Sequence, residues 1–333
     1  MTHQQTRQLV HWYAQHKRDL PWRHTRDPYA IWISEIMLQQ TRVEAVKGYY
    51  ARFLTALPTV QDLACVDDDK LLKLWEGLGY YSRARNLKKA AQVIVCEHNS
   101  QLPNTPAQLK TLPGIGDYTA GAIASLAFDV ATPAIDGNVL RVLARLWGDY
   151  ADITLPQTRR EFSTRVQAAM PSDSPGVFNQ ALMELGALVC IPRGKPLCTS
   201  CPWHDDCIAR LQNLAHELPV KPAKKPRRIE QRQLLILRCG DKLALRKRPD
   251  KGLLAGLWEL PESFALSPAL VLHDEDAGAA VHIFTHIEWH MTARKITLHE
   301  PLDDCSLVWV TQEELARDYA LPSAFAGFRN VMF

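Results

Sequence analysis

An acidic residue in an apolar helical stretch is the first candidate for chemistry. Glu35 lies in the segment SEIMLQQT (residues 34–41), on a predicted helix that also carries Trp32 and Ile36. Burial against such a surface raises the pKa of a carboxyl group, which would make Glu35 a proton donor. The alternative is a solvated surface residue, as most helical glutamates are.

A second acidic residue would complement such a donor. Asp136 lies in AIDGNV (residues 134–139), directly before a stretch with helical apolar spacing, and is predicted to be the helix N-cap. The helix dipole and the backbone amides would keep this carboxylate ionised. A neutral acid and a carboxylate can together cleave a glycosidic bond through an oxocarbenium-like state, so the pair predicts that reaction. The alternative for Asp136 is a cap without a chemical role.

Four of the eight cysteines are crowded into residues 190–207. Their spacing is C-x7-C-x2-C-x5-C, formed by Cys190, Cys198, Cys201 and Cys207. Four thiolates this close together can ligate zinc or a [4Fe-4S] cluster. Structural zinc sites more often contain two C-x2-C pairs, and this motif contains one. A disulfide is disfavoured because nothing in the sequence indicates export from a reducing cytosol.

A glycine-containing segment has the features of a phosphate contact. In LPGIGDYTAG (residues 112–121), Gly114 and Gly116 allow a tight turn, and the amides that open the next helix can then face a phosphate. A helix-hairpin-helix that grips the DNA backbone has this pattern. The alternative is a turn that only packs two helices together.

A second segment combines aromatic and basic residues. GLGYYSRARN (residues 77–86) contains two tyrosines followed by Arg83 and Arg85. The arginines suit phosphates, and a tyrosine can wedge into a base stack. The alternative is a pair of core tyrosines beside a solvated basic helix.

Helices are predicted to position these groups up to about residue 213. Apolar residues recur there at three-to-four spacing, and strand signals are scarce. Asp27 before Pro28 is a cap with proline at the first helical position, and it opens a long helix that extends to Val43. Further helices are predicted at 67–76, 82–98, 105–111, 117–128, 137–147, 157–170 and 176–189. Residues 1–213 are therefore predicted to form an all-α domain.

The pattern changes after residue 213. Residues 214–232 are basic and proline-rich, which predicts an extended interdomain linker. Alternating polarity then predicts strands at 234–238, 242–246, 281–289 and 306–310. The first two flank a Cys-Gly-Asp turn and form a predicted hairpin, and Thr311 opens a capping box. Residues 233–333 are therefore predicted to be a separate α+β domain.

Composition places the chain among ordinary globular proteins. The 333 residues include 39 Lys and Arg against 36 Asp and Glu, and 47% are hydrophobic. No apolar run approaches the roughly 18 residues of a membrane span, and no export signal is evident, so a cytosolic protein is expected. Residues 1–232 carry 29 basic and 22 acidic side chains (+7), and residues 233–333 carry 10 and 14 (−4). Only the first part is expected to attract a polyanion.

Together these segments resemble the endonuclease III-like, helix-hairpin-helix superfamily of DNA glycosylases, and within it the adenine DNA glycosylase family. The shared motifs follow the family order: LPW at 20–22, then residues 34–41, 77–86, 112–121 and 135–139, FNQ at 178–180, and the cysteine motif. The resemblance implies an all-α glycosylase domain with a [4Fe-4S] cluster on the four cysteines, followed by a Nudix-like α+β domain. It also implies a cytoplasmic, nucleoid-associated monomer that binds duplex DNA and removes adenine mispaired with 8-oxoguanine or guanine.

The resemblance also implies roles for single residues. Glu35 would protonate adenine N7, and Asp136 would stabilise the sugar cation. Tyr118 stands where related glycosylase/lyases carry a Schiff-base lysine, and a phenol cannot form that imine, so monofunctional hydrolysis is implied. The other implied contacts are Trp22, Arg23, Leu38, Val43 and Gln180 for adenine, Gln40, Tyr80, Gly114 and Gly116 for the DNA stack and backbone, and Thr41 and Leu78 for the opposing lesion.

Two features of the C-terminal part bear on the resemblance. Phe284, Thr285 and His286 lie where the family has a Phe-Ser-His loop that senses 8-oxoguanine, and threonine keeps the hydroxyl while adding a methyl group. The run GLWELP (256–261) resembles a Nudix strand, but no glutamate-rich catalytic box follows it. Pyrophosphohydrolase activity is therefore not expected.

Two other functions fit parts of the pattern. A bifunctional glycosylase/lyase of the endonuclease III type would act on oxidised pyrimidines, but Tyr118 and the extra C-terminal domain argue against it. A non-enzymatic iron–sulfur DNA-binding regulator would need only the hairpin. The presence of both Glu35 and Asp136 argues against that second alternative.

Overall fold

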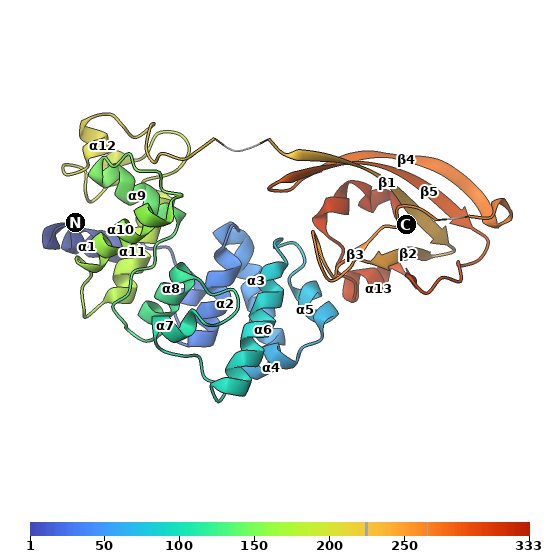
Figure 1. Cartoon of the computed structure of the whole chain (residues 1–333), viewed down its shortest axis with the longest axis horizontal. Coiled ribbons are helices and arrows are strands. Elements are labelled where there is room, and N and C mark those ends of the chain that lie inside the picture. Colours follow the sequence, from blue (N-terminus) through green and yellow to red (C-terminus); the bar gives the residue numbers. More distant parts are fainter. Residues whose placement is uncertain (224–225, 265) are drawn as a thin grey trace. The chain divides into compact units, whose positions relative to one another are not determined.

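The computed structural model describes residues 1–223, 226–264 and 266–333, and its backbone contacts divide the chain into two units. The first unit contains Met1–Cys65 and Asn86–Ala223, and the second contains Val66–Arg85 and Lys224–Phe333. Figure 1 shows that the first unit is built of helices and that a sheet dominates the second. The predicted change from helices to strands along the chain is confirmed. Residues 66–85 group with the sheet, which nothing in the sequence indicates.

The helices of the first unit are α1 (His3–His16), α2 (Pro28–Leu38), α3 (Val43–Ala56), α4 (Val60–Cys65), α7 (Pro106–Leu109), α8 (Asp117–Ala127), α9 (Gly137–Trp147), α10 (Pro156–Gln167), α11 (Pro175–Leu188) and α12 (Ile208–Leu211). Helices α7 to α11 lie near their predicted positions, whereas α1, α4 and α12 were not predicted as separate helices. The predicted cap of α2 is confirmed, because the Asp27 carboxylate accepts from Tyr29 N and Pro28 is the first helical residue. Helix α6 (Ser82–Glu97) spans the boundary between the two parts of the chain.

The predicted long helix that reaches Val43 is wrong. Helix α2 ends at Leu38, and α3 begins only at Val43. Between them Gln40 adopts a left-handed backbone conformation with φ +59°, which a continuing right-handed helix cannot contain. The consequence is an exposed polar turn that presents Gln40 and Thr41 at the end of the helix that carries Glu35.

Close packing of α9 on α11 fixes the position of Asp136. Val139 and Leu143 on α9 are fully buried in the same cluster as Phe178 of α11. Gly186 on α11 permits this approach, because an added Cβ would lie 2.7 Å from Asn138 Cβ. A larger residue at 186 would therefore displace the first turn of α9, which Asp136 caps.

The second unit contains a six-stranded mixed sheet. Its strands are β1 (Arg228–Cys239), β2 (Lys242–Lys247), β3 (Trp258–Glu259), β4 (Val271–Ile283), β5 (Ile287–Leu298) and β6 (Leu307–Val310). Their order is β3-β2-β1-β5-β4, with β6 paired to β2. The predicted hairpin is confirmed, because β1 and β2 are antiparallel and Arg238 pairs with Leu243. The capping box at Thr311 is also confirmed, at the start of α13 (Gln312–Arg317).

Two strand predictions are wrong in their extent. The alternating run at 281–289 is not one strand, because β4 ends at Ile283, β5 begins at Ile287, and Phe284 N donates to Ile287 O across the turn. The last residues of the predicted linker are also strand, since β1 begins at Arg228 and pairs in parallel with β5. Pairing with a strand distant in the sequence overrides the local preference of this basic segment for an extended, solvated chain.

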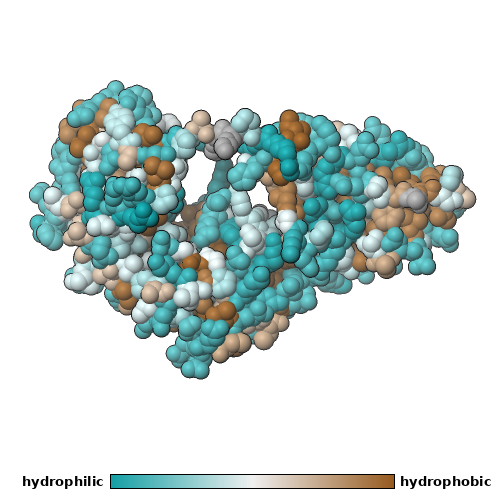
Figure 2. All heavy atoms as spheres, viewed as in Figure 1, coloured by the Kyte–Doolittle hydropathy of each residue, from teal (hydrophilic) through white to brown (hydrophobic). Residues whose placement is uncertain are grey.

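The second unit also contains α5 (Asp68–Leu74) and the loop that follows it. Its main hydrophobic core contains three fully or almost fully buried aromatic residues, Trp289, Phe325 and Phe328. The face seen in Figure 2 is mostly hydrophilic, with apolar side chains in small groups. No helix in the described residues is long and apolar enough to cross a membrane.

Candidate active site

Glu35 and Tyr118 meet where α2 packs on α8. The Tyr118 hydroxyl donates to Glu35 Oε2 at 2.5 Å, and Glu35 is 5% exposed. Burial raises the pKa of Glu35 to about 7, although the hydrogen bond from Tyr118 acts in the opposite direction. Burial also raises the pKa of Tyr118, so the phenol stays protonated. Glu35 is therefore an acid whose proton is available near neutral pH, in agreement with the prediction of a raised pKa.

Asp136 is the N-cap of α9, as predicted. Its Oδ1 accepts from Val139 N at 2.7 Å and its Oδ2 accepts from Asn138 Nδ2 at 2.8 Å. Burial raises the pKa of Asp136 above its ordinary value, because desolvation outweighs the opposing hydrogen bonds from Val139 N and Asn138. The negative charge of Asp136 also raises the pKa of Glu35, which means that the two carboxyl groups influence each other.

A hydrogen-bond path leads from this cap to the cysteine motif. Asn138 Oδ1 accepts from Arg141 Nη2 at 2.9 Å, and Arg141 Nε donates to Cys190 O at 2.8 Å. Arg141 is 6% exposed, and Nη2 also donates to Gly186 O. The first turn of α9 and the start of the cysteine motif are therefore held by the same guanidinium group.

A buried ion cluster that was not predicted from the sequence includes Arg23, one of the residues predicted to contact adenine. Glu184 on α11 is 1% exposed and binds the guanidinium groups of Arg18 and Arg23, with contacts of 2.7 and 2.8 Å. Burial raises the pKa of Glu184, but the hydrogen bonds from the two arginines outweigh it and bring the pKa to about 2. One turn earlier on the same helix, Gln180 Oε1 accepts from Tyr13 Oη at 2.7 Å. The four-residue spacing of Gln180 and Glu184 could have predicted this arrangement, because it places both side chains on the same face of α11.

Replacing Glu184 with Gln is expected to destabilise the protein by about 3 kcal/mol, because two arginines lose their buried counter-ion. The value is at the low end of the range because Arg18 is 31% exposed and partly screened. The depressed pKa means that this stability is present above pH 4.5 and is lost as the pH falls toward 2. Urea unfolding at pH 7 and pH 3 measures both effects, with the exposed Glu161→Gln as control. Equal stability of the variant and the wild type at pH 7 would contradict the assignment.

The other predicted residues of the first unit lie as follows. Trp22 is buried edge-on to Tyr50, with ring centroids 5.5 Å apart, and Leu38 and Val43 are half-buried at the facing ends of α2 and α3. Gln39 links α2 to α8 by donating to Thr119 Oγ1.

In the predicted hairpin, Gly114 has φ +79° and an added Cβ would lie 2.8 Å from Asn86 Cβ, while Gly116 is the N-cap of α8. This geometry leaves the first amides of α8 without a side-chain cap.

Tyr80, predicted to fill the DNA stack, and Thr285, predicted to sense the lesion, come together in the second unit although 205 positions separate them. Tyr80 is 48% exposed, and its hydroxyl lies 3.1 Å from Thr285 Oγ1. Phe284 packs against Trp289, and His286 O accepts from Arg228 N. Leu78, from the same loop as Tyr80, is buried.

The prediction that Arg83 and Arg85 bind phosphates is not supported. Arg83 is 9% exposed, and its Nη2 donates to the carbonyl oxygens of Leu78 and Gly79. Arg85 Nη1 donates to Ala255 O at 2.6 Å. Both guanidinium groups hold the second unit together, because the loop carbonyls need donors that the short backbone turn does not supply.

The four cysteines of the motif line one small pocket. Arg145 Nη1 donates to Cys190 Sγ at 3.4 Å, and Cys207 Sγ contacts Arg145 O at 3.4 Å. Burial raises the pKa of Cys201 to about 12, and the neighbouring thiols contribute. Four half-buried thiols around one pocket fit the donor set of a thiolate-ligated metal or cluster. Within residues 1–223, 226–264 and 266–333, however, no group of three or more His, Cys, Asp or Glu side chains has the arrangement needed to hold a metal ion.

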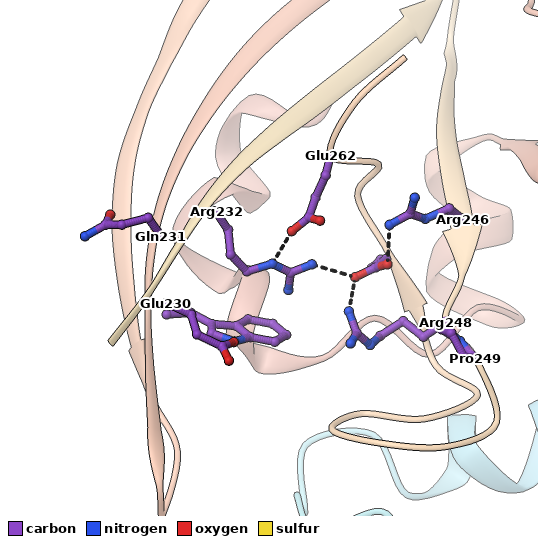
Figure 3. Close-up of a pocket in the computed structure, with 9 residues that line it drawn as sticks. Glu230, Gln231, Arg232, Arg246, Arg248, Pro249 and Glu262 are labelled. Atoms are coloured by element: carbon purple, nitrogen blue, oxygen red, sulfur yellow. Dashed lines mark hydrogen bonds and ion pairs between the residues drawn. The ribbon is translucent and has the colours of Figure 1, made fainter. Parts of the chain in front are cut away.

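A pocket on the sheet of the second unit is occupied by ion pairs (Figure 3). Glu259 on β3 is 1% exposed and binds Arg232, Arg246 and Arg248, and Arg232 also pairs with Glu262. Burial raises the pKa of Glu259, but the three arginines outweigh it and hold the pKa below its ordinary value. The Glu259 carboxylate is thus engaged in structural ion pairs within the sheet of the second unit.

Comparisons with known proteins give two matching families. The model of the HhH-GPD superfamily of base excision DNA repair proteins matches residues 33–168, and the NUDIX domain model matches residues 233–328. These matches confirm the predicted helix-hairpin-helix and Nudix-like parts of the fold.

Curated relatives extend over most of the chain. The adenine DNA glycosylase of Homo sapiens is 35% identical, covering 92% of this chain and 70% of that protein. The Mus musculus enzyme of the same name is 37% identical over 84% of this chain and 68% of its own length, and that of Arabidopsis thaliana is 38% identical over 84% and 55%.

Among solved structures, a thermostable thymine-DNA glycosylase matches with a TM-score of 0.58 and 29% identity, covering 62% of this chain and 95% of that chain. A non-covalent endonuclease III–DNA complex matches with a TM-score of 0.54 and 24% identity, covering 64% and 99%, and shares the fold.

Proposed function

The chain belongs to the adenine DNA glycosylase family, and we propose that it hydrolyses the N-glycosidic bond of adenine mispaired with 8-oxoguanine or guanine in duplex DNA. It is an enzyme of base excision repair that acts on N-glycosyl bonds. The observation that carries the proposed mechanism is the buried Glu35 carboxyl, with its pKa near 7, under the influence of a second carboxylate, Asp136.

The chemistry begins with a base outside the helix. Adenine cannot be reached inside a duplex, so it must be flipped out at an unstacking cost of a few kcal/mol. Glu35 then protonates the base at N7, which makes neutral adenine the leaving group. Asp136 offsets the positive charge that develops on the deoxyribose, and water completes the hydrolysis. Trp22, Arg23, Leu38, Val43 and Gln180 are the proposed walls of the adenine pocket.

Tyr118 supports a monofunctional reaction. Its phenol donates to Glu35 and cannot form the imine that a lysine would form at this position, so no strand cleavage is expected. The bifunctional glycosylase/lyase remains the competing mechanism, and it predicts a covalent protein–DNA adduct that borohydride traps.

Replacing Tyr118 with Phe is expected to shift the pH dependence of excision. The hydrogen bond from Tyr118 lowers the pKa of Glu35, so its loss raises that pKa and keeps the acid protonated to higher pH. The wild-type single-turnover rate should fall as the pH rises through about 7, and the variant's rate should fall at higher pH. A falling limb at the same pH in both proteins would show that Tyr118 does not tune the acid.

Cys190, Cys198, Cys201 and Cys207 are the proposed ligands of a [4Fe-4S] cluster, with zinc as the minor alternative. When bound, the cluster supplies a structural cross-link and no step of the hydrolysis. The loop between the first two cysteines contains Arg193 and Lys195, both exposed, which are proposed to contact DNA phosphates.

The remaining assignments concern the DNA around the flipped base. Gln40 and Tyr80 are proposed to fill the stack, and the hairpin with Gly114 and Gly116 to bind the backbone. The other proposed contacts, to the base opposite adenine, are Thr41, Leu78, Phe284, Thr285 and His286. The protein is also proposed to be a monomer that is located in the cytoplasm and associated with the nucleoid.

Single-turnover cleavage tests this function. Duplexes with adenine opposite 8-oxoguanine, guanine or thymine are incubated with the protein and analysed with and without alkali. Strand breaks only after alkali, fastest for the 8-oxoguanine pair, are expected. Breaks without alkali would favour the bifunctional mechanism, and equal rates for all three duplexes would contradict lesion recognition.

A further inference from the structure

The segment that carries Leu78 and Tyr80 is held by the C-terminal part of the chain. Residues 66–85 group with the sheet of the second unit, although a long stretch of sequence separates the two. Within the segment, α5 (Asp68–Leu74) leads directly into the loop at 75–81. The contacts that hold α5 therefore also determine where this loop lies.

Lys73 makes the most extensive of these contacts. Its ammonium group donates to Leu315 O at 3.0 Å and to Tyr319 O at 3.1 Å, and it pairs with Glu76 at 2.6 Å. Three acceptors match the three hydrogens of an ammonium group. Leu315 O lies in the last turn of α13, where the helix leaves carbonyl groups unsatisfied and where its dipole favours a cation. Lys73 thus caps a helix more than 200 residues away, and its side chain is only 18% exposed.

Further polar contacts secure the segment at both ends. They are Lys247 with Asp69 at 2.8 Å, Arg329 with Glu76 at 3.2 Å, and Arg85 with Ala255 O at 2.6 Å. Glu76 binds both Lys73 and Arg329, so the two basic residues share one carboxylate at the entrance of the loop.

The loop itself has a conformation that needs such support. Tyr80 has φ +48°, in the left-handed region that is strained for a residue with a Cβ. Trp75, two residues after Lys73, is fully buried and donates to Gly79 O at 3.1 Å. Arg83 donates to the same carbonyl. In this conformation the Tyr80 hydroxyl reaches Thr285 Oγ1 at 3.1 Å.

We propose that Lys73 is a positioning residue for lesion recognition: by capping α13 and binding Glu76, it holds the 75–81 loop where Tyr80 meets Thr285. The inference rests on the proposed function, which places Tyr80 and Thr285 at the DNA. Lys73 touches neither substrate nor reacting atoms. Its loss should therefore affect the dependence of the rate on the base opposite adenine more than the reaction at Glu35 and Asp136.

The test compares Lys73→Met with Lys70→Met in the full chain. Both substitutions remove one charge from α5, but Lys70 is exposed on that helix. Single-turnover rates are measured for adenine opposite 8-oxoguanine and opposite guanine. For Lys73→Met the ratio of the two rates is expected to fall about tenfold, mainly through the 8-oxoguanine duplex, and Lys70→Met is expected to keep the wild-type ratio. Lys73→Arg, which keeps the charge and the donors, should restore part of the ratio.

Hydrogen exchange of the amides at 76–81 provides a readout that does not depend on activity. Faster exchange there in Lys73→Met, with wild-type exchange in Lys70→Met, is expected. An unchanged rate ratio or unchanged exchange in a folded Lys73→Met would overturn the proposal. If the wild type excises no adenine, the proposed function fails, while the exchange measurement still decides whether Lys73 holds the loop. If Lys73→Met does not fold, Arg329→Gln takes its place, with a smaller change of the same kind expected and none contradicting the proposal.

Discussion

Replacing Asp136 with Asn is expected to reduce adenine excision by about 10³-fold or more while leaving DNA binding and folding nearly unchanged. An anion about 4 Å from a developing sugar cation contributes about 4 kcal/mol at the effective dielectric of a protein site, and each 1.36 kcal/mol is a factor of ten in rate. Asn removes that charge. It is as good an N-cap as Asp, so the hydrogen bond from Val139 N can persist. Single-turnover excision and a DNA-binding titration of the same preparation measure the two effects.

Asp27→Asn is the matched control for this experiment. Asp27 caps α2 through Tyr29 N in the way that Asp136 caps α9 through Val139 N, but it is exposed. Near-wild-type excision is therefore expected for the Asp27 variant. If Asp136→Asn lost DNA binding or thermal stability in proportion to its loss of excision, Asp136 would be a structural cap and not the residue that stabilises the cation.

Local signals in the sequence predicted the elements that carry these carboxyl groups. Asp27 followed by Pro28, the capping box at Thr311 and the Cys-Gly-Asp turn between β1 and β2 each depend on residues within a few positions of one another. Asp136 at the start of α9 belongs to the same class. Predictions of this kind are confirmed in the structure because the hydrogen bonds involved form within a single turn and do not depend on distant residues.

Features that depend on distant partners could not be predicted from the residues alone. The parallel pairing of β1 with β5 joins Arg228 to Ile287, and it converts the end of a basic, proline-rich segment into a strand. Glu184 is a core residue only because Arg18 and Arg23, more than 160 positions earlier, supply its counter-ions. The residues next to Glu184 in the sequence do not indicate that these two arginines will contact it. Its charge alone therefore predicts an exposed position.

The raised pKa of Glu35 shows how local and distant information combine. The apolar neighbours on α2 predicted burial, and the structure gives a pKa of about 7. The hydrogen bond from Tyr118, 83 positions away, could not be predicted from spacing, although it opposes the rise in pKa that burial causes. The proposed role of Tyr118 therefore comes from the fold and not only from the absence of a lysine at that position.

Replacing Glu35 with Gln is expected to lower the single-turnover rate by about 10²- to 10⁴-fold, the usual contribution of a positioned general acid. Gln has the same shape, cannot donate an acidic proton, and can still accept the hydrogen bond from Tyr118, so the fold should persist. Because burial disfavours the ionised carboxylate, the neutral amide should leave stability unchanged or raise it slightly. Excision at pH 6, 7 and 8 measures both the loss and its pH dependence.

The pH profile separates the general acid from a residue that only shapes the pocket. A wild-type rate that depends on protonated Glu35 falls as the pH rises through about 7, whereas the residual rate of Glu35→Gln should lose that dependence. The exposed Glu97→Gln on α6 serves as control and should retain both rate and profile. A residual rate in Glu35→Gln that still falls through pH 7 would assign the titration to another group, with Asp136 as the first candidate because burial raises its pKa as well.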